Sequence, residues 1–441
     1  MIIKPEKNRN LRNVQPELRY GKMKTLIKYG SCASLLAMFM LPVTSTQAAV
    51  LVQCPGDDNG DAQWTGGETQ PADTKCIHLS SSDGFANMGD GYLQYVFGYG
   101  DISGTLPEDA IDVGLYNANT SAPTIILDEG DEFYLTLTNT GMMNRPDLFD
   151  THTVHFHGFP NASSVFDGVP DASISINMGG SLTYFYNIKE PGTYLYHCHV
   201  EAAEHMQMGM QGNLYVRPAQ DEDYGPGTAN PGGLEYPAGS GRTYTQFAYN
   251  DAAPGSLPKN HGSTGFDVEM PLQLTGFDPV FHDASKNTQP LPFADMVDTY
   301  HMFNGRGYPT TVEAGDYYDV NPGEAQAENG GINSQPLTSK MTVTQGQKLL
   351  IRITNLSITK FHTVAILGLP MQVIGRGARE LTDKYETASV SLGGGEAYDV
   401  MVDTNGVAPG TYFVYITELN ELSNDQQSFG GPMTEIVVEA L

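Results

Sequence analysis

Basic residues are scarce in this chain of 441 residues, in which 23 lysines and arginines stand against 51 aspartates and glutamates. The formal net charge of −28 argues against nucleic acid and against an anionic membrane surface as partners. Such a charge would suit a cationic partner or a metal-ion substrate, although a need for solubility explains it more simply.

Long helical patterns are missing outside the first 48 residues. Short β-type runs separated by turns occur instead, for example at 125–139, 181–188 and 193–197. The 49 glycines and 27 prolines also favour many turns over a helical bundle. The sequence therefore predicts an all-β protein built from sandwich-type domains, and its length suits two or three of them.

The basic residues that do occur gather at the start of the chain. Residues 1–48 hold eight lysines and arginines, then the apolar run SCASLLAMFMLPV, then the small-residue segment TSTQAA. This order is typical of a secretory signal peptide, and the apolar run is too short to favour a retained membrane span. We expect translation to start at Met1 or Met23 and the mature protein to be secreted or periplasmic.

Cysteine is rare as well, and the three cysteines after the leader make an odd number. Cys54 and Cys76 are close in sequence and are expected to pair, since export permits disulfides. Cys198 is left alone, and an unpaired thiol in an exported protein needs a reason. Metal ligation would supply one.

Three blocks recur in the same order along the chain, which indicates two copies of one β domain. EGDEFYLTLTN (129–139) matches QGQKLLIRITN (345–355), and HTVHFHGFP (152–160) matches HTVAILGLP (362–370). GTYLYHCH (192–199) matches GTYFVYIT (410–417). The predicted organisation is a leader (1–48), a first β domain (49–217), a linker rich in Gly, Pro and acid (218–242) and a second β domain (243–441).

The second copy keeps the predicted strands but lacks most of the histidines and the cysteine of the first. His152 has a counterpart in His362, but the positions of the other histidines and of the cysteine carry different side chains. Ala365 and Leu367 stand in place of two histidines, and Tyr415–Thr417 stand in place of HCH. The first domain is therefore predicted to hold a metal site, and the second domain to lack its ligands.

Six of the eleven histidines lie in the stretches HTVHFHGF (152–159) and YHCHVEAAEHMQMGM (196–210). Because alternate residues of a strand share a face, Cys198 points away from the histidines on either side of it and toward His152. Cysteine, two histidines and a weak axial methionine are the ligands of a blue-copper site. The predicted set is His152, Cys198, His205 and Met210, the last two in a loop after the strand.

Other interpretations of this set remain open. Zinc also binds Cys and His, although it has no special use for a methionine. Met206 or Met208 would substitute for Met210, or these two methionines simply pack in the core.

The remaining histidines of the two stretches predict a second, all-imidazole copper site, made by His155, His157, His197 and His199. His155 and His157 share one strand face, and His197 and His199 share another. Electrons would pass from Cys198 to this site through one peptide bond on either side. These four histidines are the predicted catalytic residues.

The pattern H-x-x-H-x-H followed by H-C-H, His and Met resembles the multicopper oxidases, as do GTYLYHCH and FDGVP (166–170). The resemblance spans the chain after the leader and implies two tandem cupredoxin domains of Greek-key topology. It assigns His155 to type 2 copper and His157, His197 and His199 to type 3 copper. It implies one-electron oxidation of a small-molecule or metal-ion donor, coupled to dioxygen reduction, and a homotrimer.

The match to that family is incomplete. Its trinuclear copper cluster uses four H-x-H pairs, and this chain has two. Copper nitrite reductases, a sister family, need only one type 2 copper; His362 aligns with their substrate-pocket histidine, and their second-domain ligand falls near Thr417 or Glu418. A non-enzymatic copper-binding or electron-transfer protein is the third hypothesis. For the oxidase hypothesis, ligands donated by a neighbouring chain would complete the cluster.

Two further features have simple structural explanations. Asp57, Asn59, Asp61 and Glu68 match the spacing of a calcium loop, but Ala62 replaces the usual glycine, and a polar turn is the preferred interpretation. The other histidines have no partners at metal spacing and are expected to be structural; they are His78, His261, His282 and His301.

Overall fold

The computed structural model describes residues 50–159, 162–225, 227–228, 230–251, 262–313 and 324–441. The predicted signal peptide (1–48) and His261 lie outside these residues. Strands dominate the described chain, which confirms the all-β prediction. None of the described helices has the length and apolar character needed to cross a bilayer.

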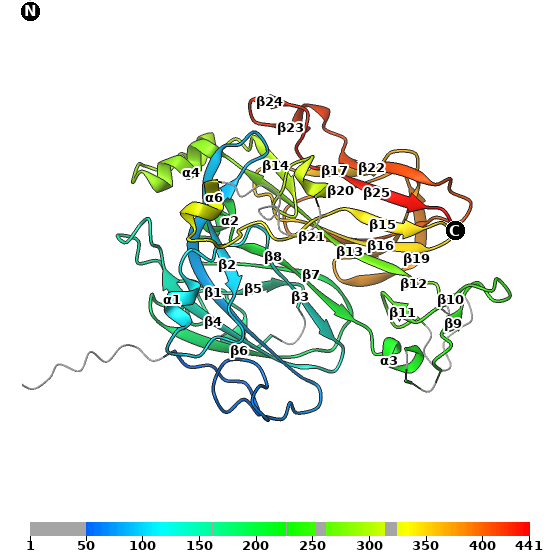
Figure 1. Cartoon of the computed structure of the whole chain (residues 1–441), viewed down its shortest axis with the longest axis horizontal. Coiled ribbons are helices and arrows are strands. Elements are labelled where there is room, and N and C mark those ends of the chain that lie inside the picture. Colours follow the sequence, from blue (N-terminus) through cyan, green and yellow to red (C-terminus); the bar gives the residue numbers. More distant parts are fainter. Residues whose placement is uncertain (1–49, 160–161, 226, 229, 252–261, 314–323) are drawn as a thin grey trace, which may run out of the picture. The chain divides into compact units, whose positions relative to one another are not determined.

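Two four-stranded sheets make up the first sandwich (Figure 1). The first sheet has the order β2(Leu93–Asp101), β1(Thr74–Asn87), β4(Glu132–Gly141) and β6(Ser181–Asn187). The second has the order β3(Ala122–Asp128), β8(Gln211–Arg217), β7(Gly192–His197) and β5(His155–His157). β1 runs parallel to β4, and β3 runs parallel to β8. Alternate residues such as Leu135, Leu137, Tyr194 and Leu214 fill the core between the sheets.

The second sandwich repeats this topology. Its larger sheet contains the run β14(Tyr300–Phe303), β13(Val268–Phe277), β16(Lys348–Asn355) and β21(Glu396–Asp403), with β18(Met371–Arg376), β19(Arg379–Thr387), β23(Ser423–Asn424) and β24(Gln427–Ser428) at its two ends. Its smaller sheet has the order β15(Met341–Thr344), β25(Met433–Glu439), β22(Gly410–Ile416), β17(His362–Ile366) and β20(Ser389–Leu392). The parallel pairs recur between β13 and β16 and between β15 and β25. The blocks that match in sequence therefore occupy equivalent strands.

Short helices and minor strands connect these elements (Figure 1). They are α1(Ala110–Gly114), α2(Ala202–Met208), α3(Gln220–Tyr224), α4(Pro279–Lys286), α6(Glu324–Glu328), η1(Ser164–Phe166), η2(Phe293–Asp295), η3(Thr310–Val312), η4(Leu419–Glu421), β9(Leu234–Glu235), β10(Thr243–Tyr244), β11(Gln246–Phe247) and β12(Gly265–Phe266). α3 and β9 lie within the predicted linker. The domain boundaries themselves stay a prediction.

Two local expectations were wrong. The β-type run 125–139 is two strands, because a turn at Gly130 (φ 108°) separates β3 from β4. His205 does not lie in a loop but in helix α2, which ends at Gly209 in the left-handed conformation. A helix of seven residues is too short to give a readable periodicity, although Ala, Glu, Met and Gln all favour helix.

Cys54, in the polar region before β1, forms the expected disulfide with Cys76. In the turn that follows Cys54, the Asp57 carboxylate accepts the backbone N–H groups of Gly60 and Ala62. The Glu68 carboxylate accepts the N–H of Thr65. These acidic side chains therefore hold the turn itself together, which favours the polar-turn interpretation over calcium binding.

Arg352 on β16 anchors the start of β7 against the second sandwich. Its guanidinium is fully buried, with Nε 2.7 Å from Glu269 Oε1 and Nη1 3.5 Å from Asp399 Oδ1. Nη1 also donates to Thr193 Oγ1 at 3.0 Å, and the Thr193 hydroxyl donates in turn to Asp399. Because Thr193 begins the stretch that leads to Cys198, this network positions the strand that carries the candidate ligands.

Candidate metal centres

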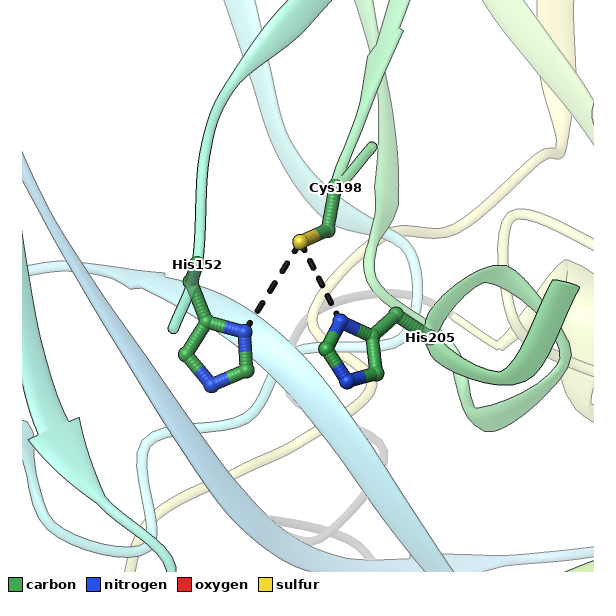
Figure 2. A group of neighbouring side chains, drawn as sticks. All are labelled: His152, Cys198 and His205. Carbon is green, nitrogen blue, oxygen red and sulfur yellow. Dashed lines mark hydrogen bonds between the residues drawn. The ribbon is translucent and has the colours of Figure 1, made fainter. Parts of the chain in front are cut away.

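His152, Cys198 and His205 converge on one fully buried point of the first sandwich. Cys198 directly follows β7, His205 comes from α2, and His152 pairs with Ile176 in an isolated β-bridge. Figure 2 shows both imidazoles turning Nδ1 toward the sulfur, with Sγ to Nδ1 distances of 3.7 Å for His152 and 3.2 Å for His205. The structure thus brings together three of the four residues predicted for blue copper.

The electrostatics of this group favour the thiolate form of Cys198. Burial alone would raise the pKa of the Cys198 thiol, but His205 and His152 hold it well below its ordinary value. Burial would lower the pKa of His205, yet Cys198 and Asp150 raise it to about 10. A thiolate is the form of cysteine that binds metal ions, so the metal-free chain already holds the ligand in its reactive state.

Met210 is fixed beside this group by its main chain. Its carbonyl accepts the N–H of Cys198 at 3.2 Å, and its own N–H donates to the His205 carbonyl at 2.9 Å. The side chain of Met210 is fully buried in the same core. Met208 is buried there too, whereas Met206 lines a cleft beside the other histidines. Met210 is therefore better placed than Met206 to complete a soft donor set for copper.

The four remaining histidines of the two stretches also form one cluster. β5 pairs with β7 so that His155 lies opposite His197. His157 Nε2 and His197 Nε2 are 2.9 Å apart, and the His155 and His199 ring centroids are 4.9 Å apart. Cys198 sits between two members of this cluster in the chain, so the two candidate centres share one strand end, as the alternation predicts.

Backbone carbonyls orient three of these imidazoles through Nδ1. His155 contacts the Asp167 carbonyl at 2.5 Å, His157 the Gly395 carbonyl at 3.3 Å, and His197 the Cys198 carbonyl at 2.8 Å. A carbonyl only accepts hydrogen bonds, so each Nδ1 carries the proton and each Nε2 keeps a lone pair for a ligand, with those of His157 and His197 facing each other at 2.9 Å.

Burial also keeps two of the imidazoles neutral. It lowers the pKa of His157 and lowers that of His197 to about 3. Neutral imidazoles held in one tautomer are what a copper ion requires of its histidine ligands.

Two clefts reach this cluster. One has a volume of about 620 Å³ and is lined by His157, His197, His199 and Met206, and by residues 356–361 and 393–396 of the second sandwich. The other, of about 450 Å³, touches His155 and Asp167. Among the described residues that line them, the second sandwich contributes no imidazole. The second sandwich forms a wall of these clefts, while the imidazoles that line them come from the first sandwich.

The structure also gathers residues that the sequence did not group. His301, His362 and Glu421 lie together inside the second sandwich, all buried. His362 is fully buried and lines neither of these two clefts. No spacing along the chain signals this group.

Paired sandwiches with a buried Cys–His₂ centre define the class of copper-binding cupredoxin proteins. Models of the multicopper oxidase family match residues 104–221 and 281–438, which is more than half of the chain. The chain belongs to the multicopper oxidase family, which confirms the resemblance drawn from the motifs and, at the level of the family, the copper cofactor.

Among curated relatives, multicopper oxidase MmcO of Mycobacterium tuberculosis is 25% identical over 302 residues, 66% of this chain and 48% of its own length. The chain thus spans about half the length of that relative. A blue copper oxidase from Nitrosomonas europaea has the same fold, with a TM-score of 0.57, 20% identity and coverage of 83% and 86% of the two chains. A copper nitrite reductase from Thermus scotoductus also shares it, with a TM-score of 0.51, 14% identity and coverage of 83% and 62%.

Proposed function

We propose that this protein is an exported copper oxidoreductase that oxidises a donor one electron at a time and reduces dioxygen. The blue, type 1 copper is held by His152, Cys198, His205 and Met210. The type 2/3 copper is held by His155, His157, His197 and His199. The observation that supports this most directly is the position of Cys198 between two histidines of the other cluster.

Bound copper supplies the one-electron chemistry, and the chain supplies geometry and environment. The peptide bonds on either side of Cys198 give a covalent path of a few atoms from the sulfur to the two flanking imidazoles. The buried Cys198 group excludes water, while the 620 Å³ cleft leaves the imidazole cluster open to a small oxidant. The sequence of events is therefore oxidation of the donor near the buried centre and reduction of the acceptor in the cleft.

Nitrite is the second candidate acceptor, and the number of ligands favours it. The described clefts present four imidazoles from one chain, which suits fewer copper ions than the family's trinuclear cluster. The fold does not decide between the two acceptors, since oxidases and a nitrite reductase share it. A carrier that only transfers electrons is the third candidate.

Assembly and location complete the proposal. A homotrimer, implied by the resemblance, would bring residues of a neighbouring chain to the clefts and add the missing ligands. The Cys54–Cys76 disulfide fits an oxidising compartment, and we propose a secreted or periplasmic location. The donor is a phenol or a reduced metal ion such as Fe(II), Cu(I) or Mn(II).

A copper count per chain, with optical and paramagnetic spectra, tests the proposal on protein without residues 1–48. The Cys198→Ser variant should lose the intense blue band entirely and keep its other copper. Oxygen uptake with an added donor, together with magnetically coupled copper, would support the oxidase. Nitrite reduction with one isolated type 2 copper would replace dioxygen with nitrite as the acceptor. Blue copper without either activity would indicate a carrier, and the absence of any blue band would refute the site assignment.

A further inference from the structure

A second group of metal-binding side chains lies inside the second sandwich, away from both copper clusters. His301 is on β14, His362 begins β17, and Glu421 ends η4. Glu421 Oε2 lies 3.4 Å from His362 Nδ1 and 3.8 Å from His301 Nε2, and the two rings are 5.1 Å apart. Two imidazoles and one carboxylate thus point at a common centre.

Two of the three atoms that face this centre make no hydrogen bond to any described residue, although they lie 3.4 Å from each other. His362 Nδ1 and Glu421 Oε2 are buried and make no hydrogen bond within the described part of the chain. A buried polar atom without a partner is costly, so such atoms in one place call for a ligand. A metal ion among the three side chains would satisfy them together.

His362 and Glu421 are each held by a contact on the side that faces away from the common centre. His362 Nε2 contacts the Ser357 hydroxyl at 3.2 Å, and Lys360 Nζ lies 2.6 Å from Glu421 Oε1. Such outer contacts are typical of metal ligands, because they fix the side chain and turn its free atom toward the ion. Ser357 and Lys360 also line the 620 Å³ cleft, so the group lies directly behind the wall of that cleft.

The group occupies the place in the second sandwich that the Cys198 centre occupies in the first. His362 repeats His152, and Ile416 repeats Cys198 in the matched blocks. Glu421 follows Ile416 in the connection after β22, as His205 follows Cys198 in the connection after β7. Since isoleucine replaces the thiolate, the donor set here is nitrogen and oxygen without sulfur.

The protonation of the histidines is compatible with metal binding. Burial lowers the pKa of His301 to about 3, and it lowers the pKa of His362 despite the neighbouring Glu421. Both imidazoles are therefore neutral at physiological pH and able to donate a lone pair.

We propose that His301, His362 and Glu421 form a third metal site, which binds a divalent first-row transition-metal ion such as Zn²⁺ or Cu²⁺. Two imidazoles and one carboxylate are a known donor set for such ions, and they leave coordination positions open. Without a thiolate, the site gives no intense blue band. The proposal is independent of which acceptor the copper clusters reduce.

Zinc stoichiometry tests the site. The full chain without its leader is stripped with a chelator, reloaded with Zn²⁺, and assayed for metal per chain. Glu421→Gln and His301→Gln should each bind about one zinc fewer than the unaltered protein, since removal of one ligand removes most of the affinity. After loading with copper instead, both variants should keep the full blue absorbance.

His78→Gln is the matched control. His78 is a buried imidazole of the first sandwich that contacts the Thr138 hydroxyl and belongs to none of the three clusters. It should retain the full zinc number.

Equal zinc numbers in the unaltered protein and in Glu421→Gln would overturn the proposal, even if that variant unfolds at a lower temperature. That outcome would mean that the group is a structural ion pair of Lys360 and Glu421. Oxygen uptake and the blue band report on the first sandwich separately, so failure of the third site and failure of the copper assignment are distinguishable.

Discussion

Replacing Arg352 with methionine should destabilise the protein by about 3–5 kcal/mol at pH 7.5, because it breaks a buried ion pair, removes the cationic partner of Asp399 and leaves Glu269 with Arg217 alone. Arg352 is fully buried between Glu269 and Asp399 and also donates to Thr193 at the start of β7. Methionine fills most of the space but offers no donor. The free energy of unfolding, measured by urea denaturation of metal-free protein, gives the magnitude.

The same variant should show a distinctive pH dependence. Burial alone would raise the pKa of Glu269, and Arg352 and Arg217 together hold it below its ordinary value. In the intact protein this lowered pKa stabilises the fold above about pH 4.3, the ordinary glutamate range, and the benefit is lost as pH falls further. In Arg352→Met the effect of burial on Glu269 dominates, so the pKa of Glu269 rises. The cost of burying its negative charge is then relieved when the carboxyl gains a proton. The loss of stability should therefore be smaller at pH 5 than at pH 7.5.

Arg379→Met provides the comparison. Arg379 also joins the two sandwiches, through Glu190 at 3.4 Å, but its side chain is 72% exposed. An exposed pair of this kind contributes about 0–1 kcal/mol. If Arg352→Met costs no more than Arg379→Met, or costs the same at both pH values, the reasoning about the buried network is refuted.

Two further predictions concern the copper clusters. Gly395→Ala would place a Cβ 2.7 Å from the His157 ring and should lower copper occupancy of the four-histidine cluster, with the blue band intact. Gly406→Ala shares the positive φ but meets nothing within 4 Å in the described structure, so metal analysis should find its copper unchanged; equal losses in both variants would contradict the steric argument. Met210→Leu should shift the reduction potential of the blue centre while the band persists, because the axial ligand tunes that potential. Met206→Leu, which alters the cleft instead, should leave the potential unchanged in a redox titration.

Local periodicity was enough to predict which candidate ligands of the first sandwich lie together. The alternation of a strand separates Cys198 from the histidines on either side of it, and the structure realises this separation at the end of β7. The repeat likewise predicted which strands of the second sandwich correspond, since the matched blocks form β4 and β16, β5 and β17, and β7 and β22. These features depend on neighbours in the chain, which a sequence displays directly.

The features that the sequence did not reveal depend on distant contacts. The Gly395 carbonyl that orients His157 lies 238 residues further along the chain. His301, His362 and Glu421 meet only because β14, β17 and η4 converge in the fold. No local spacing encodes such meetings, and a histidine without a near neighbour therefore looked merely structural.

The main-chain acceptors of the imidazole cluster have a consequence for how such sites change over time. Asp167, Gly395 and Cys198 orient the histidines with carbonyl oxygens, which every amino acid possesses. A substitution at Asp167 would alter the side chain and leave the acceptor in place. The orienting contact at Asp167 is consequently insensitive to exchange of that residue's side chain. Gly395 and Cys198 are constrained for other reasons, the first because a Cβ would meet the His157 ring and the second because it is a candidate ligand. Shifts of the backbone near residue 395 would therefore disturb the orientation of His157 even where no orienting residue is exchanged.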